Sequence, residues 1–270
     1  APATIRYYHS VLHNALSVAV KWELVPRNVC DLTSPPRRER YEMQTLTLEQ
    51  AQKLLDALSG HKWEALFKLA LATGLRRGEV LGLKWQDIDF EASTLQVRRI
   101  LSRVPTNTAN REHVYVEAEP KTKRSRRSVV IAAFAREALE KHHTIQLEAK
   151  QKAGEYWQEN DYVFCTTRGN HLNPNYVVDV LKKLLRNAGL PNIRFHDLRH
   201  SAATLLFKMK VHPKIVQELL GHSNISITLD IYSHVLPGMQ EDAINSLDQA
   251  FKGLKRGNPR AGKKKPQKDS

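Results

Sequence analysis

The sequence predicts a mainly helical chain with one small antiparallel sheet, an α+β fold class. Apolar residues recur at helical spacing through most of the chain, and glycine and proline separate the segments. Between residues 94 and 131 the apolar pattern instead alternates with a period of two. With 270 residues, 41% hydrophobic and 26% charged, the chain can bury a core in one large or two ordinary domains.

Four helices are predicted before the sheet. The first has an apolar face, and a linker from Ser34 to Arg40 follows it. Thr47 and Gln50 have the spacing of a capping box and open the second helix. The third is strongly apolar and ends at Gly74, a residue typical of helix C-termini. These helices are expected at Thr4–Trp22, Leu48–Leu58, Trp63–Thr73 and Arg77–Lys84.

The alternating stretch predicts three strands of a single sheet, and everything after Cys165 is predicted to be helical. Breaks are expected at Gly189–Pro191, Val211–Pro213 and Leu236–Gly238. A last helix is expected at Met239–Phe251, and the lysine-rich tail after it is expected to be disordered. The predicted strands are Thr94–Leu101, Val114–Ala118 and Ser128–Ile131, and a long helix follows at Ala132–Ala153.

The charge balance favours a polyanionic partner. The formal net charge is +14, and seven lysines and arginines against one aspartate put +6 of it in the tail Lys255–Ser270. The other +8 belongs to the body of the chain, so nucleic acid is the leading partner class. Two distant cysteines without a CxxC pair argue against a disulfide framework and fit a reducing cytoplasm. No apolar run reaches membrane-spanning length and no signal peptide is recognisable, so no membrane partner is expected.

Arg76 comes just after Gly74, near the start of the next helix. A guanidinium there can hold a phosphate through a bidentate fork and stays charged at any working pH. Most arginines in such turns form only surface salt bridges, so this residue alone is a weak signal. Glu79 lies three residues on, faces the same side of the helix, and is expected to orient Arg76.

A cluster of cations, the basic hairpin cluster, lies between two of the predicted strands. From the residues alone, these side chains predict a hairpin that contacts the phosphate backbone of DNA. The cluster consists of Lys121, Lys123, Arg124, Arg126 and Arg127.

His196 and Arg199 are three residues apart in a helical segment and therefore share one face. Asp197 is expected to cap the start of that helix, and His200 to lie in the core. A metal site of His196, Asp197 and His200 is the competing interpretation. It would need a further ligand and a glutamate base, and the sequence has no HExxH motif, so no metal and no cofactor are predicted.

His222 follows Gly221 at a helix end, where the backbone turns. Tyr232 comes ten residues later, on a segment with Ile225 and Leu229 at helical spacing. Taken by itself, Tyr232 is one more aromatic residue on an apolar helix face.

Taken in order, these residues resemble the tyrosine recombinase (phage integrase) family. The features that carry the resemblance are Arg76, Lys121 in a Lys-Thr pair, His196-x-x-Arg199, Gly221-His222 and Tyr232-Ser233-His234. The likeness runs from about Thr45 to about Leu254. It implies the C-terminal part of a helical core-binding domain and a linker at residues 1–40, a catalytic domain at 41–254, and a basic tail at 255–270. It also implies that an N-terminal part is missing.

The resemblance implies an attack on a phosphodiester without a metal. Arg76 and Arg199 would clamp the nonbridging oxygens, with a hydrogen bond from His222. His196 would accept the proton of Tyr232, because a tyrosine with a pKa of about 10 is a poor nucleophile at neutral pH. Lys121 would protonate the leaving 5′ oxygen, with Lys123 as the rival. The predicted catalytic residues are Arg76, Lys121, His196, Arg199, His222 and Tyr232.

The implied function is site-specific recombination by an integrase of a phage or mobile element. A 3′-phosphotyrosyl intermediate retains the bond energy, so no ATP is needed, and strand exchange passes through a Holliday junction. The implied partners are double-stranded DNA with attachment or recombination sites, three further copies of the chain in a homotetramer, and an excision factor. We expect the protein in the bacterial cytoplasm, associated with the nucleoid when it is on DNA.

Two other functions stay open at the level of the sequence. A type IB topoisomerase would use the same residues to relax DNA without exchanging strands. A non-enzymatic helix-turn-helix regulator is suggested by Lys214–Leu220, Gly221 and Ser226–Val235. A regulator, however, would have no use for a tyrosine nucleophile or a general acid.

Overall fold

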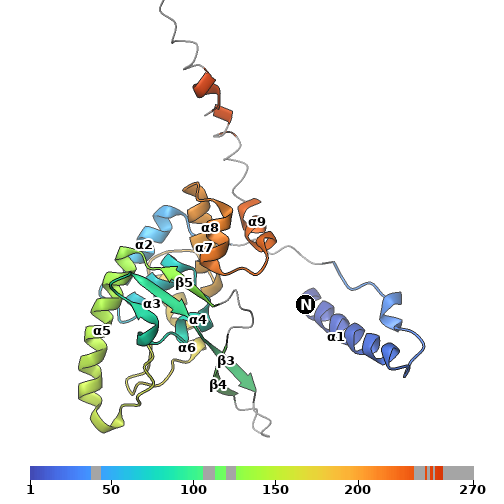
Figure 1. The fold of residues 1–270 in the computed structure, drawn as a ribbon, viewed down its shortest axis with the longest axis horizontal. Coiled ribbons are helices and arrows are strands. Elements are labelled where there is room, and N and C mark those ends of the chain that lie inside the picture. Colours follow the sequence, from blue (N-terminus) through green and yellow to red (C-terminus); the bar gives the residue numbers. More distant parts are fainter. Residues whose placement is uncertain are drawn as a thin grey trace, which may run out of the picture. The chain divides into compact units, whose positions relative to one another are not determined.

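The computed structural model describes residues 1–37, 44–105, 113–119, 126–233, 241, 244–245 and 247–251. The chain divides into two compact units, Ala1–Met43 and Gln44–Ser270 (Figure 1). The predicted fold class is confirmed, since helices predominate and the strands pair in an antiparallel way.

The first unit is a long helix with a short segment folded back on it. Helix α1 (Pro2–Lys21) is followed by the 3-10 helix η1 (Val29–Leu32). The Asn28 amide joins them by donating to the His13 carbonyl and to the Ser17 hydroxyl, each at 2.9 Å. Helix α1 confirms the predicted amphipathic helix, but none of its residues is buried within this unit.

The second unit contains the remaining named helices. The capping box predicted at Thr47 is present, with the Gln50 amide 3.2 Å from the Thr47 hydroxyl. Gly74 ends α3 in a left-handed conformation with φ of 62°, as predicted. The helices are α2 (Leu48–Leu58), α3 (Glu64–Thr73), α4 (Arg77–Leu81), η2 (Trp85–Asp87), α5 (Ala133–Ala153), η4 (Gly154–Tyr156), α6 (Pro174–Asn187), α7 (Phe195–Lys208), α8 (Pro213–Leu220) and α9 (Ile225–Ser233).

Helix α3 forms the centre of the core. Seven of its ten residues are buried, and α2, α5 and α7 pack against it. A helix that is apolar on most sides is stable only inside a core. The turn at its end is fixed from the side of α7, because the Arg199 guanidinium donates to the Gly74 carbonyl at 2.8 Å.

The prediction of a single sheet is wrong, because the described strands form two sheets. The predicted strand Thr94–Leu101 is interrupted at Arg98 and Arg99, and the partner strand changes there from β5 to β4. Arg99 pairs with the buried Asp87, which removes its side chain from the alternating pattern. The sheets are β1 (Ile88–Asp89), β2 (Thr94–Val97) and β5 (Arg127–Val130), and β3 (Ile100–Pro105) with β4 (His113–Ala118).

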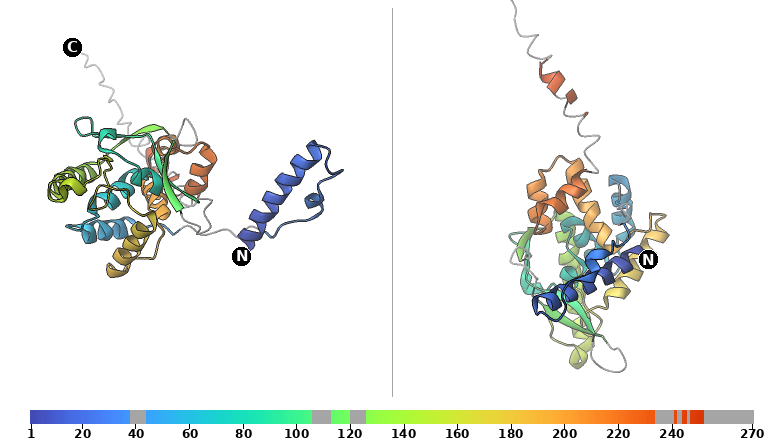
Figure 2. Two further views of the ribbon diagram at one scale, coloured as in Figure 1. Left: turned by 90° about the horizontal axis from the view of Figure 1, so that it is seen from below. Right: turned by 90° about the vertical axis from the view of Figure 1, so that its right-hand side faces the viewer.

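Strands β3 and β4 extend from the body of the unit as a two-stranded ribbon (Figures 1 and 2). Glu117 in β4 anchors the ribbon to the body. Its carboxylate accepts from the Tyr162 hydroxyl at 2.6 Å and pairs with Lys84 at 2.8 Å. Burial, followed by this contact with Glu117, raises the pKa of Tyr162, so the hydroxyl remains a donor. Ionic contacts therefore hold the β4 end of the ribbon.

Helices α7, α8 and α9 pack on one another and lie together in both views of Figure 2. The breaks predicted around residues 189–191 and 211–213 are confirmed, since α6 ends at Asn187 and α8 begins at Pro213. The predicted helix Arg77–Lys84 is too long. Helix α4 ends at Leu81 because the residues after it form backbone hydrogen bonds with a distant segment: Leu83 accepts from Val163 and Trp85 donates to Asp161.

Only part of the predicted last helix, Met239–Phe251, lies within the described residues, and residues 241, 244–245 and 247–251 are helical. The expected break at 236–238 and the tail 255–270 lie outside the described residues. Within the described parts of the chain, no helix has the length and apolar character needed to cross a membrane.

Candidate active site

Arg76 lies in the turn between α3 and α4. The Glu79 carboxylate accepts from the Arg76 backbone amide at 2.9 Å and from its guanidinium NH1 at 2.8 Å. The Arg76 side chain is 39% exposed, whereas that of Glu79 is 1% exposed. Glu79 therefore holds Arg76 from the protein side, and part of the guanidinium faces solvent.

Arg127, the last member of the basic hairpin cluster, is turned into the protein. Its side chain is 7% exposed, and its NH2 lies 3.0 Å from Glu79 Oε2. Its Nε donates to the Leu219 carbonyl at 2.9 Å. The Arg127 guanidinium thus contacts Glu79 and Leu219 within the protein, and its predicted contact with DNA stays a prediction.

Arg199, in the first turns of α7, is 1% exposed. Its NH1 donates to the Gly74 carbonyl, but its NH2 is buried and has no hydrogen-bond partner among the described residues. Burial, followed by the positive charge of Arg76, lowers the pKa of Arg199 to about 9. A buried donor without a partner is unfavourable, and a bound anion would relieve both this loss and the repulsion between the arginines.

His196 and His200 face each other on α7, with ring centroids 4.8 Å apart and planes at 88°. His196 is exposed as a whole residue, yet partial desolvation of its imidazole and the nearby charges of His200 and Arg199 lower its pKa to about 4. His200 is half-buried, and burial lowers its pKa as well. Asp197 accepts from the Arg194 backbone amide at 2.8 Å, the capping role predicted for it.

His222 follows the left-handed Gly221 at the end of α8 and is 6% exposed. Its Nδ1 lies 2.8 Å from the Thr228 hydroxyl of α9. Burial, followed by the charges of Arg199 and Arg76, lowers the pKa of His222 to about 3. At neutral pH the imidazole is therefore uncharged; Thr228 contacts its Nδ1, and within the described ranges no hydrogen bond is seen at Nε2.

Tyr232 lies on α9, one turn after Thr228. Its ring packs against Phe207 of α7, with centroids 4.9 Å apart at 68°. Among the described residues, no hydrogen bond joins its hydroxyl to the arginines or histidines. The structure therefore gathers Arg76, His196, Arg199 and His222, and it places Tyr232 on a helix that packs against α7 and α8.

Other members of the basic hairpin cluster are partly outside the described residues. Lys121, Lys123 and Arg124 are among those for which no position is described. Arg126 is exposed and pairs with Glu119 at 2.6 Å, which leaves it accessible at the surface.

The residues of the competing metal interpretation have other partners. Both oxygens of Asp197 accept from the Arg194 guanidinium, at 2.8 and 3.0 Å, so this carboxylate is already neutralised. Over the described ranges, no group of three or more His, Cys, Asp and Glu residues is arranged to hold a metal ion.

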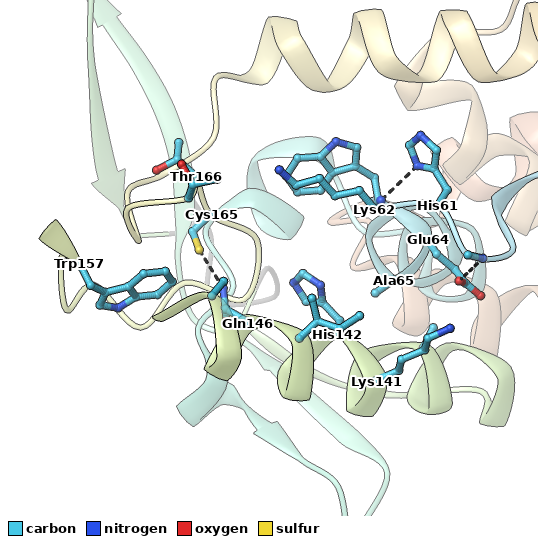
Figure 3. A pocket seen from close by; sticks show the side chains of 16 residues that line it. His61, Lys62, Glu64, Ala65, Lys141, His142, Gln146, Trp157, Cys165 and Thr166 are labelled. Carbon is cyan, nitrogen blue, oxygen red and sulfur yellow. Dashed lines mark hydrogen bonds between the residues drawn. The ribbon is translucent and has the colours of Figure 1, made fainter. Parts of the chain in front are cut away.

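A cavity lies between the start of α3 and α5, apart from Arg76, Arg199 and His222 (Figure 3). Trp157, His142 and Cys165 line it, and Lys62 and Lys141 also contribute. The Gln146 amide lies 2.8 Å from Cys165 Sγ, and burial raises the pKa of that thiol. None of the predicted catalytic residues lines this cavity.

Two residues of the site were missed in the sequence. Thr228, which is fully buried, contacts His222, and Gln217 donates from its side chain to the His222 carbonyl at 3.1 Å. The four-residue spacing between Thr228 and Tyr232 puts them on one helix face and could have singled out Thr228. Nothing in the sequence distinguishes Gln217 from other glutamines of an amphipathic helix.

The chain resembles known proteins along most of its length. The chain is 40% identical over 259 residues to a XerC-like tyrosine recombinase of Caldanaerobacter subterraneus subsp. tengcongensis, covering 92% of this chain and 66% of that protein. It is 26% identical over 297 residues to an integrase of Saccharopolyspora erythraea, covering 93% and 68%. It thus spans about two thirds of the length of these curated relatives.

A solved structure of the Tn1549 transposon integrase with transposon right end DNA has a similar fold. The TM-score is 0.71 at 24% identity, over 85% of this chain and 74% of that one. The phage integrase family model matches residues 44–238, most of the second unit. The chain therefore belongs to the phage integrase family.

Proposed function

We propose that this chain is the catalytic part of a site-specific DNA recombinase that acts through a 3′-phosphotyrosyl intermediate. The observation that carries the proposal is the Arg199 guanidinium. It is almost fully buried beside Arg76, and its NH2 has no partner in the part of the chain that the structure describes. Family membership gives the reaction class, and the related Tn1549 integrase binds transposon DNA.

A phosphodiester suits the cluster of Arg76, Arg199 and His222. Two guanidiniums would bind its nonbridging oxygens, and the neutral His222 would donate from Nε2 without adding a third charge. The negative charge grows on these oxygens as the nucleophile attacks, so fixed donors stabilise the transition state more than the substrate. In this proposal the protein's own donors carry the stabilisation of the phosphoryl oxygens.

Proton transfer from Tyr232 would involve His196. Because the pKa of His196 is lowered to about 4, its imidazole is neutral at pH 7 and can accept a proton. The phosphodiester brought next to it is negative and would raise that pKa, which strengthens the base when substrate is bound. The Tyr232 oxygen then forms the bond to phosphorus as the bond to the 5′ oxygen breaks.

Lys121 is proposed to give a proton to the leaving 5′ oxygen, with Lys123 as the rival. The proposal rests on the likeness of the Lys-Thr pair to the family pattern and on the placement of the neighbouring strand β5 beside Glu79. For each bond between phosphorus and a 5′ oxygen that breaks, one bond between phosphorus and the Tyr232 oxygen forms, so the bond energy is retained. A 5′ hydroxyl from another strand can therefore reverse the step without ATP, which permits exchange through a Holliday junction.

Assembly is proposed to involve both ends of the chain. Residues 1–40 would be the C-terminal part of a helical core-binding domain, residues 41–254 the catalytic domain, and 255–270 a basic tail. Ile244, Leu247 and Phe251 are 55–60% exposed on the described parts of the C-terminal helical stretch. Such an apolar face would suit packing on a neighbouring copy in a homotetramer on DNA, with an excision factor as a further partner.

The test is a covalent trap. Wild-type protein and Tyr232→Phe would be mixed with fragmented bacterial DNA in EDTA and quenched with SDS, and the attached DNA would be sequenced. We expect adducts from the wild type at one recurring sequence and none from Tyr232→Phe, although both bind DNA.

Adducts that survive in Tyr232→Phe would contradict the proposal. Tyr232-dependent adducts scattered over many sequences would instead favour a type IB topoisomerase. No adducts from a chain that still binds DNA would favour the regulator.

A further inference from the structure

Arg127 joins three elements that surround the phosphate-binding cluster. From the start of β5, its NH1 and NH2 reach the two carboxylate oxygens of Glu79 in α4, at 3.3 and 3.0 Å. Its Nε donates to the carbonyl of Leu219 near the end of α8, at 2.9 Å. Of the two described members of the basic hairpin cluster, Arg126 is exposed and Arg127 is buried.

Arg127 and Arg76 share the carboxylate of Glu79. Burial alone would raise the pKa of Glu79, but the hydrogen bond and charge of Arg127, with smaller contributions from Arg76, hold it below its ordinary value. Arg127 contacts both carboxylate oxygens of Glu79, and Arg76 donates to Oε1 through its NH1. Without Arg127, the buried carboxylate would rely on Arg76 alone and draw it away from a phosphate.

Arg127 also holds the turn that presents His222. Leu219 lies in the last turn of α8, where carbonyls lack helical partners and a positive charge is favourable. The next turn residue, Gly221, has φ of +67°, and a Cβ there would lie 2.8 Å from NH1 and 2.9 Å from Cδ of Arg127. The Arg127 guanidinium therefore contacts the turn at Leu219–Gly221, directly before His222.

We infer that Arg127 is a positioning residue that sets Arg76 and His222 in place for the reaction, without contacting the DNA itself. This inference rests on the proposed function, because Arg76 and His222 bind the phosphate in that proposal. It makes a distinct prediction: loss of the Arg127 fork slows cleavage of bound DNA, whereas loss of a DNA contact weakens binding.

The test compares Arg127→Lys with the wild type on a duplex that carries a cleavage site recovered by the covalent trap. Lysine keeps the charge but has one nitrogen, so it cannot hold Glu79 and Leu219 together. We expect a Kd within about threefold of the wild type and cleavage about 30-fold slower in single turnover, a change of about 2 kcal/mol. The matched control is Arg136→Gln, which removes an exposed ion pair with Glu140 on α5 and should change neither quantity.

A double-mutant cycle shows whether Arg127 acts through Glu79. Glu79→Gln keeps the side-chain size and removes the charge. In that background, Arg127→Lys should slow cleavage by several-fold less than in the wild type, because the two residues share one network. Equal losses in both backgrounds, weaker binding in place of slower cleavage, or a wild-type rate in Arg127→Lys would each overturn the inference.

Two further measurements keep the outcome decisive. If Arg127→Lys does not fold, as judged by circular dichroism, Glu79→Gln alone should slow cleavage about tenfold with unchanged binding, and a wild-type rate would overturn the inference.

Failure of the proposed function would appear earlier, as wild-type protein without Tyr232-dependent adducts. The probe is then inorganic phosphate, which should raise the melting temperature of the wild type more than that of Glu79→Gln. Equal shifts, at ionic strength matched with chloride, would also overturn the inference.

Discussion

His222 is a buried histidine kept uncharged by its surroundings. Burial and the charges of Arg199 and Arg76 lower its pKa to about 3, and Thr228 occupies its Nδ1. A neutral imidazole can donate a hydrogen bond to a phosphoryl oxygen without the desolvation penalty of a third buried charge. The same low pKa makes the fold sensitive to acid.

The first prediction concerns acid stability. The unfolded chain protonates His222 near pH 6.5 and the folded chain only near pH 3, so the unfolded state binds more protons between these values. The free energy of unfolding should therefore fall as the pH drops below about 6.5, and His222 alone should account for about 2 kcal/mol at pH 5. The free energy of unfolding, measured with urea, should differ less between pH 7.5 and pH 5 in His222→Asn than in the wild type. Equal differences would mean that His222 titrates normally in the folded chain.

The second prediction concerns Thr228. If its hydroxyl donates to Nδ1 of His222, the ring keeps its proton on Nε2, where a phosphate would be met. Thr228→Val keeps the shape and removes this hydrogen bond, and it should slow cleavage about tenfold or more. Thr228→Ser keeps the hydroxyl and should cleave within about threefold of the wild type. Single-turnover rates decide, and a wild-type rate in Thr228→Val would remove Thr228 from the account.

At this scale, the sequence identified the residue types that meet a phosphate but not those that hold them. The resemblance to the family, carried by short local motifs, predicts Arg76, His196, Arg199 and His222, and the structure brings these four residues together. The sequence predicts a DNA contact for Arg127 because a run of cations gives no sign of which member turns inward. Its partner Glu79 is 48 residues away, and only the fold brings the two together.

At the scale of elements, Gly74 connects the central helix α3 to the arginine turn. It has φ of 62°, and a Cβ at this position would overlap Cδ2 of Leu220 in α8. The close approach lets the Gly74 carbonyl accept from Arg199. Glycine is therefore required here by backbone conformation and by packing together.

The third prediction uses this difference between glycines. Gly74→Ala should lower the free energy of unfolding by about 2–4 kcal/mol, through backbone strain and overlap with Leu220. Gly60 has φ of +72° but nothing within 4 Å of an added Cβ, so Gly60→Ala should lose only about 1 kcal/mol of strain. Urea denaturation of the two variants measures the difference. Equal losses would show that the packing against α8 contributes nothing.

Local signals predicted most helices well, and they failed where distant segments meet. The Thr47 capping box and the Gly74 end depend on neighbouring residues, so they could be found in the sequence. The strand Thr94–Leu101 was predicted as continuous because its alternation hides the pairing of Arg99 with Asp87. The predicted helix Arg77–Lys84 is too long because the pairing of Leu83 and Trp85 with the distant residues 161–163 cannot be seen in the sequence.

At the scale of the whole molecule, the charge and the family carry the argument. The body of the chain has a net charge of +8 apart from the +6 of the tail, as expected for a protein that binds a polyanion. The chain divides near residue 43, at the end of the predicted linker. The apolar face of α1 stays exposed within its own unit, and in the proposal this unit is part of a larger DNA-binding domain.

The measurement that tests the central claim most directly is identification of the amino acid joined to DNA. Wild-type protein would be trapped on DNA in EDTA, digested with nuclease and protease, and the modified peptide sequenced by mass spectrometry. The account predicts a nucleotide linked through its 3′ phosphate to the Tyr232 oxygen, and no such peptide from Tyr232→Phe. A linkage to any other residue, or through a 5′ phosphate, would contradict it.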